Sequence, residues 1–183
     1  MKRTMPLQLT VGITLALTGA LPAAAKPDEA LPAPASQIVD ASLPRARADA
    51  QLLAARRFYA FWNTGEVSYL DAAVGPGFID RTLPKGRPQG PEGPAFASKG
   101  FRAAVPDLRC EVRQMIVAGD RVVAHLRFTG HFTGSFDGKP GAGQPVDFIA
   151  TDILRVVDGR VVENWHIEDN LTLMQQLGVV ESK

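Results

Sequence analysis

Cysteine is almost absent from the sequence. Cys110 is the single cysteine among 183 residues, so no internal disulfide can form and the fold has to depend on its hydrophobic core. Cys110 lies in an alternating apolar run, which indicates a small buried hydrophobe and not a nucleophile. The chain also lacks the short histidine and cysteine spacings of metal sites, and its three histidines lie far apart in sequence. We therefore predict no metal site.

The sequence also has no excess of positive or negative charge. The formal net charge is +1, so the sequence offers no basic surface of the kind that binds nucleic acid, and we expect no nucleic-acid partner. A hydrophobic content of 45% is ordinary for a globular protein, and the length fits one domain.

The sequence has a single long apolar run, at residues 7–21. It follows the basic pair Lys2 and Arg3, and Ala23 to Ala25 after it fit the small-residue rule for signal peptidase. The run is shorter than the roughly 20 residues that span a bilayer, which disfavours a membrane anchor. Residues 1–25 are therefore interpreted as a signal peptide, and the mature protein is expected to be exported, periplasmic or secreted, with no membrane association after cleavage.

The rest of the chain divides into a linker and one domain. Residues 26–43 are rich in alanine and proline and are expected to form an extended linker without regular structure. Residues 44–183 form the domain. Apolar spacing predicts helices over 44–62, 66–74, 93–105 and 171–177, a short strand at 78–80, and longer strands over 109–117, 121–132, 146–157 and 160–168.

The order of these elements predicts an α+β fold. Helices come first and a meander of at least four strands follows, so the helices are expected to pack on one face of a curved antiparallel sheet. Strict alternation places Cys110, Val112, Gln114 and Ile116 on one side of the first long strand, and Val122, Ala124, Leu126 and Phe128 on one side of the second. Residues 82–94 hold four prolines and are predicted to be a surface loop, which is either the rim of a site or a plain connector.

Asp158-Gly159 between two apolar strands is a strong hairpin signal. A two-residue turn without irregularity places Asp152 opposite Trp165 and Thr151 opposite His166, so that Asp152, Trp165 and Asp169 share one face. A single β-bulge would turn Trp165 and Asp169 to the opposite face and bring His166 onto the face of Asp152, because side chains alternate with a period of two. The sequence alone leaves these two registers open.

Six short motifs occur in a familiar order: Asn63 to Glu66, Pro106 to Leu108, Gly119 to Val123, Gly130 to Gly134, Asp158 to Trp165 and Gln176 to Gly178. Over residues 47–180 the series resembles the SnoaL-like polyketide cyclases, or ester cyclases, of the nuclear transport factor 2-like superfamily. The resemblance implies a cone-shaped fold, a homodimer packed through the sheet, and an aldol-type ring closure that needs no cofactor. It also implies an acid near the last strand, with a histidine on the neighbouring strand. Here those positions carry His166 and Asp152, with the residue types exchanged.

The candidate catalytic residues are therefore Asp152, His166 and Asp169, since proton abstraction next to a carbonyl needs a desolvated base and a partner. Trp62, Phe128, Phe148 and Trp165 are expected to line an apolar pocket, with a plain core position as the alternative for Trp62 and Trp165. Structural alternatives remain: Asp169 could cap the last helix, His166 could face solvent or a dimer partner, and Asp152 could pair with Arg127 or Arg155.

Two functions fit these residues. The first is cofactor-free acid/base catalysis on a small carbonyl-type or polyketide-like molecule, of the cyclase, isomerase or hydrolase type. The second is a non-catalytic module of the same fold that binds a small apolar molecule or serves as a dimeric scaffold. The direction of the acidic side chains distinguishes them: acids that point into a closed apolar pocket favour the enzyme.

Overall fold

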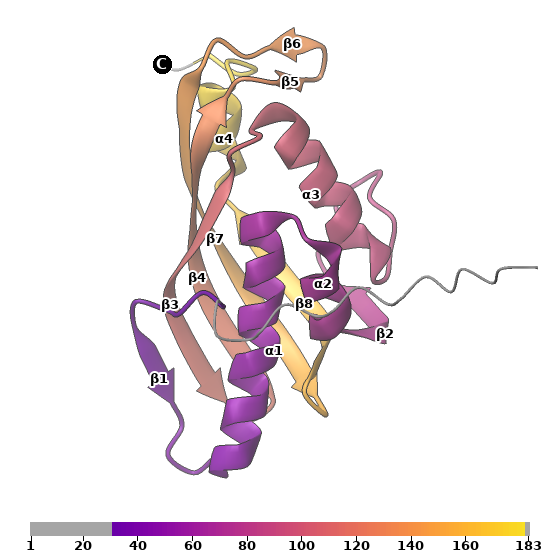
Figure 1. The fold of residues 1–183 in the computed structure, drawn as a ribbon, viewed down its shortest axis with the longest axis vertical. Coiled ribbons are helices and arrows are strands. Elements are labelled where there is room, and N and C mark those ends of the chain that lie inside the picture. Colours follow the sequence, from indigo (N-terminus) through magenta and orange to yellow (C-terminus); the bar gives the residue numbers. More distant parts are fainter. Residues whose placement is uncertain (1–30, 182–183) are drawn as a thin grey trace, which may run out of the picture.

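The fold is α+β, with three helices packed against one face of a curved six-stranded sheet (Figure 1). The computed structural model describes residues 31–181, so the expected signal peptide lies outside the described residues and export stays a prediction. The elements in chain order are β1 (Gln37–Val39), α1 (Arg45–Thr64), α2 (Val67–Ala73), β2 (Val74–Asp80), α3 (Glu92–Ala104), β3 (Arg109–Ala118), β4 (Arg121–Phe132), β5 (Ser135–Phe136), β6 (Lys139–Pro140), β7 (Gln144–Val157), β8 (Arg160–Glu168) and α4 (Asn170–Gln176).

The sheet has the strand order β1-β3-β4-β7-β8-β2. Its four central strands are antiparallel, as the sequence predicts. The two edge strands differ from the expectation, because β1 pairs parallel to β3 and β2 pairs parallel to β8. The parallel pairing of β2 matters for function, since it brings the end of β2 beside the middle of β8.

The inner face of the sheet, toward the helices, carries the core. On β4 the predicted inner set, Val122, Ala124, Leu126 and Phe128, is buried. On β3 the prediction is right only for Cys110 and Val112. The pairing of β3 with β4 shifts between Val112 and Gln114, so that Met115 and Val117 are buried in place of Gln114 and Ile116. A bulge of one residue exchanges the faces beyond it.

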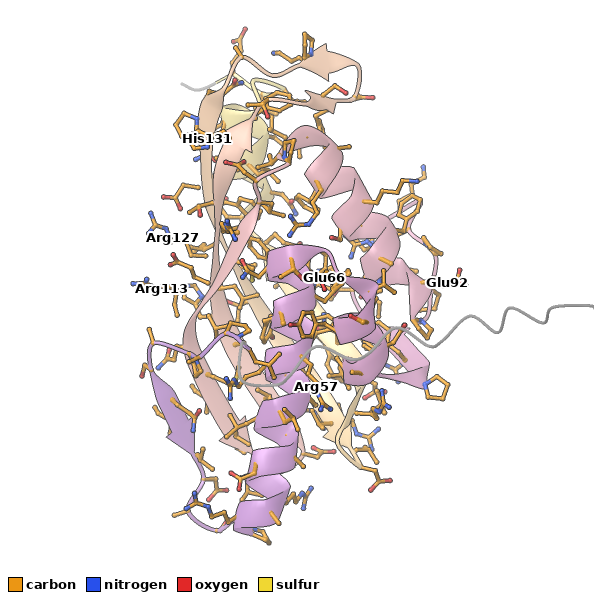
Figure 2. All side chains as sticks on the ribbon, in the orientation of Figure 1. Arg57, Glu66, Glu92, Arg113, Arg127 and His131 are labelled. Atoms are coloured by element: carbon orange, nitrogen blue, oxygen red, sulfur yellow. The ribbon has the colours of Figure 1, made fainter. Side chains whose placement is uncertain are left out.

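The opposite face of β3 and β4 is polar. Arg113, Arg127 and His131 point away from the helices (Figure 2). The Arg127 guanidinium donates to the Asp147 carboxylate at 2.9 Å, and His131 Nδ1 lies 2.7 Å from Asp107 Oδ2. These side chains are well exposed, so the pairs contribute little to stability.

Helix α1 provides the apolar layer over the sheet. It begins after Pro44, whose fixed φ suits a helix start, and ends at Gly65, which adopts a left-handed φ of 78°. Phe58, Tyr59 and Phe61 are almost fully buried. Among the described residues no helix is long and apolar enough to cross a membrane.

The prediction of an irregular linker over residues 26–43 is wrong for the part that the structure describes. Gln37–Val39 forms β1, and Leu31 is buried in the core. The Arg56 guanidinium donates to the carbonyl oxygens of Leu31 at 2.8 Å and of Pro32 at 3.1 Å. Prolines prevent a helix here, but they do not prevent an edge strand.

Gly134 lies where the strand β4 leaves the sheet and passes the end of α3. A Cβ atom at this position would lie 1.9 Å from the carbonyl oxygen of Ala103, so the backbone would have to shift. We expect Gly134→Ala to lower the free energy of unfolding by about 2 kcal/mol or more, as overpacking does. Chemical denaturation measures this. Gly77→Ala is the matched control, since nothing lies within 4 Å of its added methyl group, and equal losses in both variants would contradict the prediction.

Candidate active site

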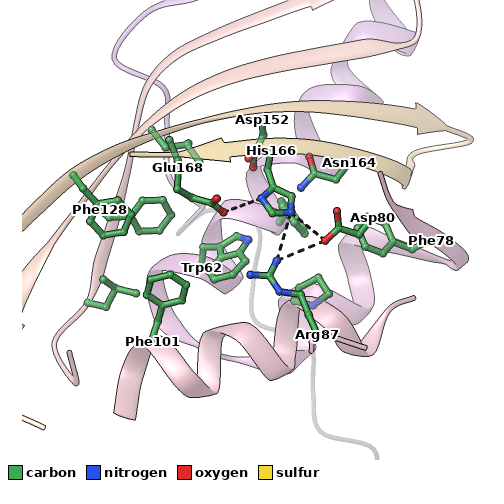
Figure 3. A pocket seen from close by; sticks show the side chains of 16 residues that line it. Trp62, Phe78, Asp80, Arg87, Phe101, Phe128, Asp152, Asn164, His166 and Glu168 are labelled. Atoms are coloured by element: carbon green, nitrogen blue, oxygen red, sulfur yellow. Dashed lines mark hydrogen bonds and ion pairs between the residues drawn. The ribbon is translucent and has the colours of Figure 1, made fainter. Parts of the chain in front are cut away.

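A pocket lies between the inner face of the sheet, α1 and α3 (Figure 3). It encloses about 540 Å³ including its open mouth, of which the centres of water molecules can occupy about 30 Å³. One part of the wall is aromatic and is formed by Phe58, Trp62, Phe78, Phe101, Phe128 and Phe148. The other part is polar and is formed by Asp80, Arg87, Asp152, Asn164, His166 and Glu168. A narrow apolar space with a few converging polar groups is the usual form of a small-molecule site.

The aromatic wall is closely packed. Phe128 and Phe148 stack with ring centroids 5.1 Å apart, and Phe101 of α3 stacks on Phe148 at 6.2 Å. Trp62 of α1 meets Phe101 and Phe128 edge to face. The sequence expectation that Trp62, Phe128 and Phe148 line a pocket agrees with these positions.

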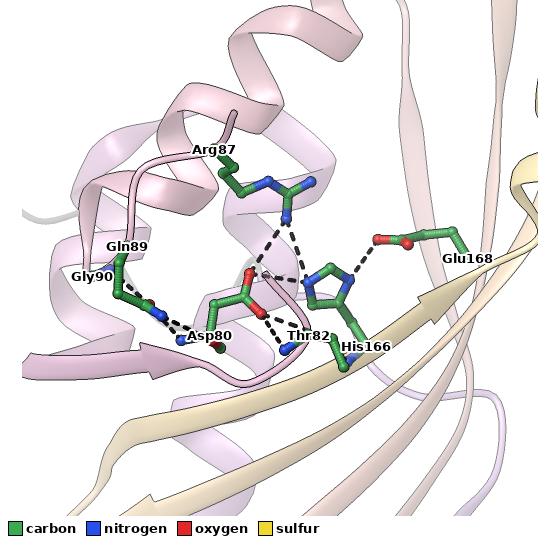
Figure 4. Close-up of polar contacts among 7 residues, drawn as sticks. All are labelled: Asp80, Thr82, Arg87, Gln89, Gly90, His166 and Glu168. Atoms are coloured by element: carbon green, nitrogen blue, oxygen red, sulfur yellow. Dashed lines mark hydrogen bonds and ion pairs between the residues drawn. The ribbon is translucent and has the colours of Figure 1, made fainter. Parts of the chain in front are cut away.

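His166 lies at the centre of the polar wall, on the inner face of β8. Its Nε2 is 3.0 Å from Asp80 Oδ2 and its Nδ1 is 2.8 Å from Glu168 Oε1, so both ring nitrogens are engaged by carboxylates (Figure 4). Burial lowers the pKa of His166, but the hydrogen bonds and charges of Glu168 and Asp80 outweigh it and raise the pKa to about 9. At neutral pH the ring is therefore an imidazolium that donates to both carboxylates.

Asp152 lies directly opposite His166, on the neighbouring strand β7. Its side chain is buried, and the Tyr59 hydroxyl donates to Oδ2 at 3.2 Å. Burial raises the pKa of Asp152 to about 7, although the positive charge of His166 lowers it. The alternative pairing with Arg127 or Arg155 is wrong, since these arginines lie on the outer face with Asp147 and Asp120.

The register that brings Asp152 and His166 together depends on a bulge. The Asp158-Gly159 turn forms as predicted, with φ of 49° and 70°. However, the pairing of β7 with β8 shifts between Arg155 and Val156. Asp152 therefore faces His166, and the register without irregularity is wrong.

The same bulge removes Trp165 from the pocket. Trp165 pairs with Ile153 on the outer face of the sheet, where the Arg121 guanidinium lies 5.5 Å from its ring centroid. The expectation that Trp165 lines the pocket is therefore wrong.

Asp169 also lies outside the pocket. It is exposed and caps helix α4: Oδ1 accepts a hydrogen bond from the Thr172 backbone N–H at 3.1 Å, and Oδ2 from the Thr172 hydroxyl at 2.7 Å. These hydrogen bonds lower the pKa of Asp169. The assignment of Asp169 as a catalytic acid is thus corrected to that of an N-cap.

The loop after β2 supports the charged cluster. The Gln89 side chain accepts a hydrogen bond from the Asp80 backbone N–H at 2.7 Å, and its Nε2 donates to the Asp80 carbonyl oxygen at 2.9 Å (Figure 4). Thr82 Oγ1 accepts a hydrogen bond from the His166 backbone N–H at 2.9 Å. The Arg87 guanidinium lies 3.6 Å from Asp80 Oδ2 and 3.4 Å from His166 Nε2. Of the two alternatives for this loop, the rim of a site and a plain connector, the structure shows the first.

Four polar residues of the site were not found from the sequence: Asp80, Arg87, Asn164 and Glu168. Asn164 and Glu168 had a signal, because they lie two residues on either side of His166 and so share its strand face. Asp80 had none, since its position depends on the parallel pairing of β2 with β8, and Arg87 was included only as part of the loop over residues 82–94. Within residues 31–181 no group of three or more histidine, cysteine, aspartate or glutamate side chains is arranged to hold a metal ion.

Comparison with known proteins shows the family and the fold. The family model described as SnoaL-like polyketide cyclase matches residues 52–177. A candidate polyketide cyclase from Bacillus cereus ATCC 10987 is 45% identical, with a TM-score of 0.77 over 83% of this chain and 96% of that chain. AclR, a candidate hydroxylase from Streptomyces galilaeus, is 26% identical, with a TM-score of 0.66 over 75% and 85% of the two chains. IdmH, a candidate polyketide cyclase from Streptomyces antibioticus, is 28% identical, with a TM-score of 0.63 over 72% and 98%. Among curated proteins no match was found.

The raised pKa of Asp152 predicts a pH-dependent effect of Asp152→Asn on stability. The folded state favours the neutral carboxyl of Asp152. The contribution of this neutral carboxyl to the free energy of unfolding is fully present below pH 3.8, decreases as the pH rises, and is lost above about pH 7. Between pH 4 and pH 8 the variant should gain up to about 4 kcal/mol of unfolding free energy relative to wild type. Urea unfolding at the two pH values measures this.

Asp169→Asn is the control for this stability measurement. Asp169 is exposed and its pKa is lowered, so this variant should not gain stability as the pH rises. If Asp152→Asn changed the unfolding free energy equally at both pH values, the buried, protonated form of Asp152 would be ruled out.

Proposed function

Because the chain belongs to the SnoaL-like polyketide cyclase family, we propose that its pocket performs cofactor-free acid/base chemistry on a small, mainly apolar carbonyl compound. The observation that carries the proposal is the pair of Asp152 and His166, which face one another at the polar wall of an otherwise aromatic pocket. The class includes ring closure, isomerisation and hydrolysis, all of which begin with proton transfer or charge development beside a carbonyl.

In this proposal Asp152 is the base. Its pKa of about 7 leaves a useful fraction ionised at neutral pH, and the ionised form is a much stronger base than an exposed carboxylate. It removes a proton from the carbon next to the carbonyl. The electron pair of that C–H bond forms a carbon–carbon double bond, and the π pair of the carbonyl moves onto its oxygen, which gives an enolate.

His166 stabilises the negative charge that develops. Its imidazolium lies beside Asp152, and the two carboxylates that keep it charged also fix the orientation of the ring. A fixed positive charge in a site with little water acts more strongly than one in solution. Asp80, Glu168 and the loop that holds Arg87 thus act by positioning His166.

Deuterium exchange tests the proton abstraction without knowledge of the natural substrate. In D₂O the protein should accelerate exchange at the carbons next to the carbonyl of an aromatic ketone such as 2-tetralone, followed by proton NMR. Asp152→Asn should lower the exchange rate by roughly 10²- to 10⁴-fold, the usual contribution of a general base. Asp169→Asn is the matched control and should retain the wild-type rate, because Asp169 lies on the surface as a helix cap. Equal rates in all three proteins would reject Asp152 as the base.

The two pKa values also predict the shape of the pH profile. The reaction needs ionised Asp152, which is available above about pH 7, and protonated His166, which is available below about pH 9. The exchange rate should therefore be bell-shaped, with a maximum between these values. A rate that continued to rise above pH 9 would show that the charge of His166 is not needed.

The alternative is a binding module without a reaction. It is favoured by one feature: both nitrogens of His166 are already occupied by carboxylates, so the ring has no free N–H group to pass to a substrate. Saturable binding of 2-tetralone without accelerated exchange would support this alternative.

We also propose that the protein is a homodimer, packed through the outer face of β7 and β8. The proposal is supported by the exposed apolar side chains Ile149, Ile153 and Ile167 on that face, the last of them 74% exposed. An exposed apolar patch of this kind is typical of an interface. Sedimentation velocity should give a dimer for wild type and a monomer for the double variant Ile153→Lys/Ile167→Lys. A monomeric wild type would reject the proposal.

A further inference from the structure

Asn164 lies in the pocket wall with an unused hydrogen-bonding group. It occupies the inner face of β8, two residues before His166, and is 5% exposed. Its Oδ1 is fully buried and has no hydrogen-bond partner among the described residues. Figure 3 shows the amide beside the His166 ring, on the side of Asp80. Buried side-chain carbonyls in proteins are nearly always paired, so this one calls for an explanation.

The position of Asn164 separates it from other groups of this kind. In the part of the chain that the structure describes, the buried atoms without a partner are Gln51 Oε1, Ser98 Oγ, Arg102 Nε and Asn164 Oδ1. Only Asn164 lines the pocket with the charged cluster. An aliphatic residue at this position would fill the same inner face without an unpaired group, so packing does not account for an amide here.

The neighbouring polar groups are already occupied. Both His166 nitrogens are engaged by Asp80 and Glu168, and Asp152 accepts a hydrogen bond from Tyr59. A ligand oxygen could bond His166 only by displacing a carboxylate. Asn164 Oδ1 can accept a hydrogen bond from a ligand hydroxyl without giving up a hydrogen bond that it already makes. A ligand carbonyl oxygen would instead accept from the Nδ2 N–H groups, which a half-turn of the amide brings to the place of Oδ1.

The charges around Asn164 indicate what kind of oxygen it would meet. The carboxylates of Asp80 and Glu168 lie on the same wall and balance the charges of Arg87 and His166. A ligand carboxylate would face these two acids, and a ligand ammonium would face the two cations. A neutral carbonyl or hydroxyl oxygen is repelled neither by the two acids nor by the two cations.

We propose that Asn164 is a ligand-binding residue of this pocket: its side-chain amide hydrogen-bonds a neutral carbonyl or hydroxyl oxygen and places that oxygen beside Asp152 and His166. The inference deepens the proposed function and rests on it for the nature of the ligand. It makes Asn164 the residue that selects oxygen-bearing ligands over hydrocarbons of the same shape.

The first test uses the wild-type protein and two ligands of the same shape. Acetophenone carries a carbonyl where α-methylstyrene carries a CH₂ group. The sequence holds three asparagines, Asn63, Asn164 and Asn170, so selective ¹⁵N-asparagine labelling gives three side-chain amide signals. The Asn164 signal should shift with acetophenone and much less with α-methylstyrene. Asn63, which accepts a hydrogen bond from the Cys110 N–H, and Asn170, at the start of α4, serve as internal controls.

The second test measures selectivity. Wild type should bind acetophenone about fivefold more tightly than α-methylstyrene, the effect of one neutral hydrogen bond. Asn164→Leu should remove this preference and leave α-methylstyrene binding unchanged. Ser98→Ala, which removes a buried unpaired group outside the pocket, should keep the wild-type preference. A preference that survived in Asn164→Leu, or an Asn164 signal that responded equally to both ligands, would overturn the inference.

These readouts separate the inference from the proposed function. Ketone-selective binding through Asn164 without accelerated deuterium exchange would support the inference and reject catalysis. Accelerated exchange with no response of the Asn164 signal would support catalysis and reject the role of Asn164.

Discussion

The paired charges of His166 are the interaction on which the site depends. A buried imidazolium is costly without partners, and here one carboxylate comes from the end of β2 and the other from β8 itself. Asp80 reaches this position only because β2 pairs parallel to β8, and the Gln89 side chain holds the backbone of Asp80 in place. The edge strand and the loop after it therefore do more than close the fold: they keep a positive charge inside an apolar pocket.

The bulge in the β7–β8 hairpin decides which chemistry faces the pocket. Without it, Trp165 and not His166 would lie opposite Asp152, and the imidazolium would face solvent. With it, Asn164, His166 and Glu168 point inward as a row, and Trp165 lies on the outer face with Ile153 and Ile167. One extra residue thus separates a polar row in the pocket from an apolar surface, and the two faces of β8 serve different functions in the proposals.

The sequence predicted the α+β fold and most elements because local signals decide them: Pro44 and Gly65 bound α1, and Asp158-Gly159 forms the expected turn. It also identified Asp152 as an unusual residue on an apolar strand face, while His166 became a candidate through the family resemblance. It could not choose the register, because a bulge leaves no reliable mark in residue types. It missed Asp80 because the contact with His166 joins positions 86 residues apart in sequence. Asp169 was misread because a helix cap and a catalytic acid use the same side chain at a strand end.

The aromatic wall and the charged row depend on each other. Phe58, Phe128 and Phe148 keep water from the inner face, and this loss of solvation is the largest cause of the raised pKa of Asp152. The imidazolium opposite limits that rise, so the carboxyl remains able to ionise near neutral pH. A less apolar pocket would leave Asp152 a weak base, and a pocket without His166 would keep it protonated. In the proposed function, this balance between burial and the charge of His166 suits Asp152 to proton transfer, and the balance is set by residues from α1, β4, β7 and β8 together.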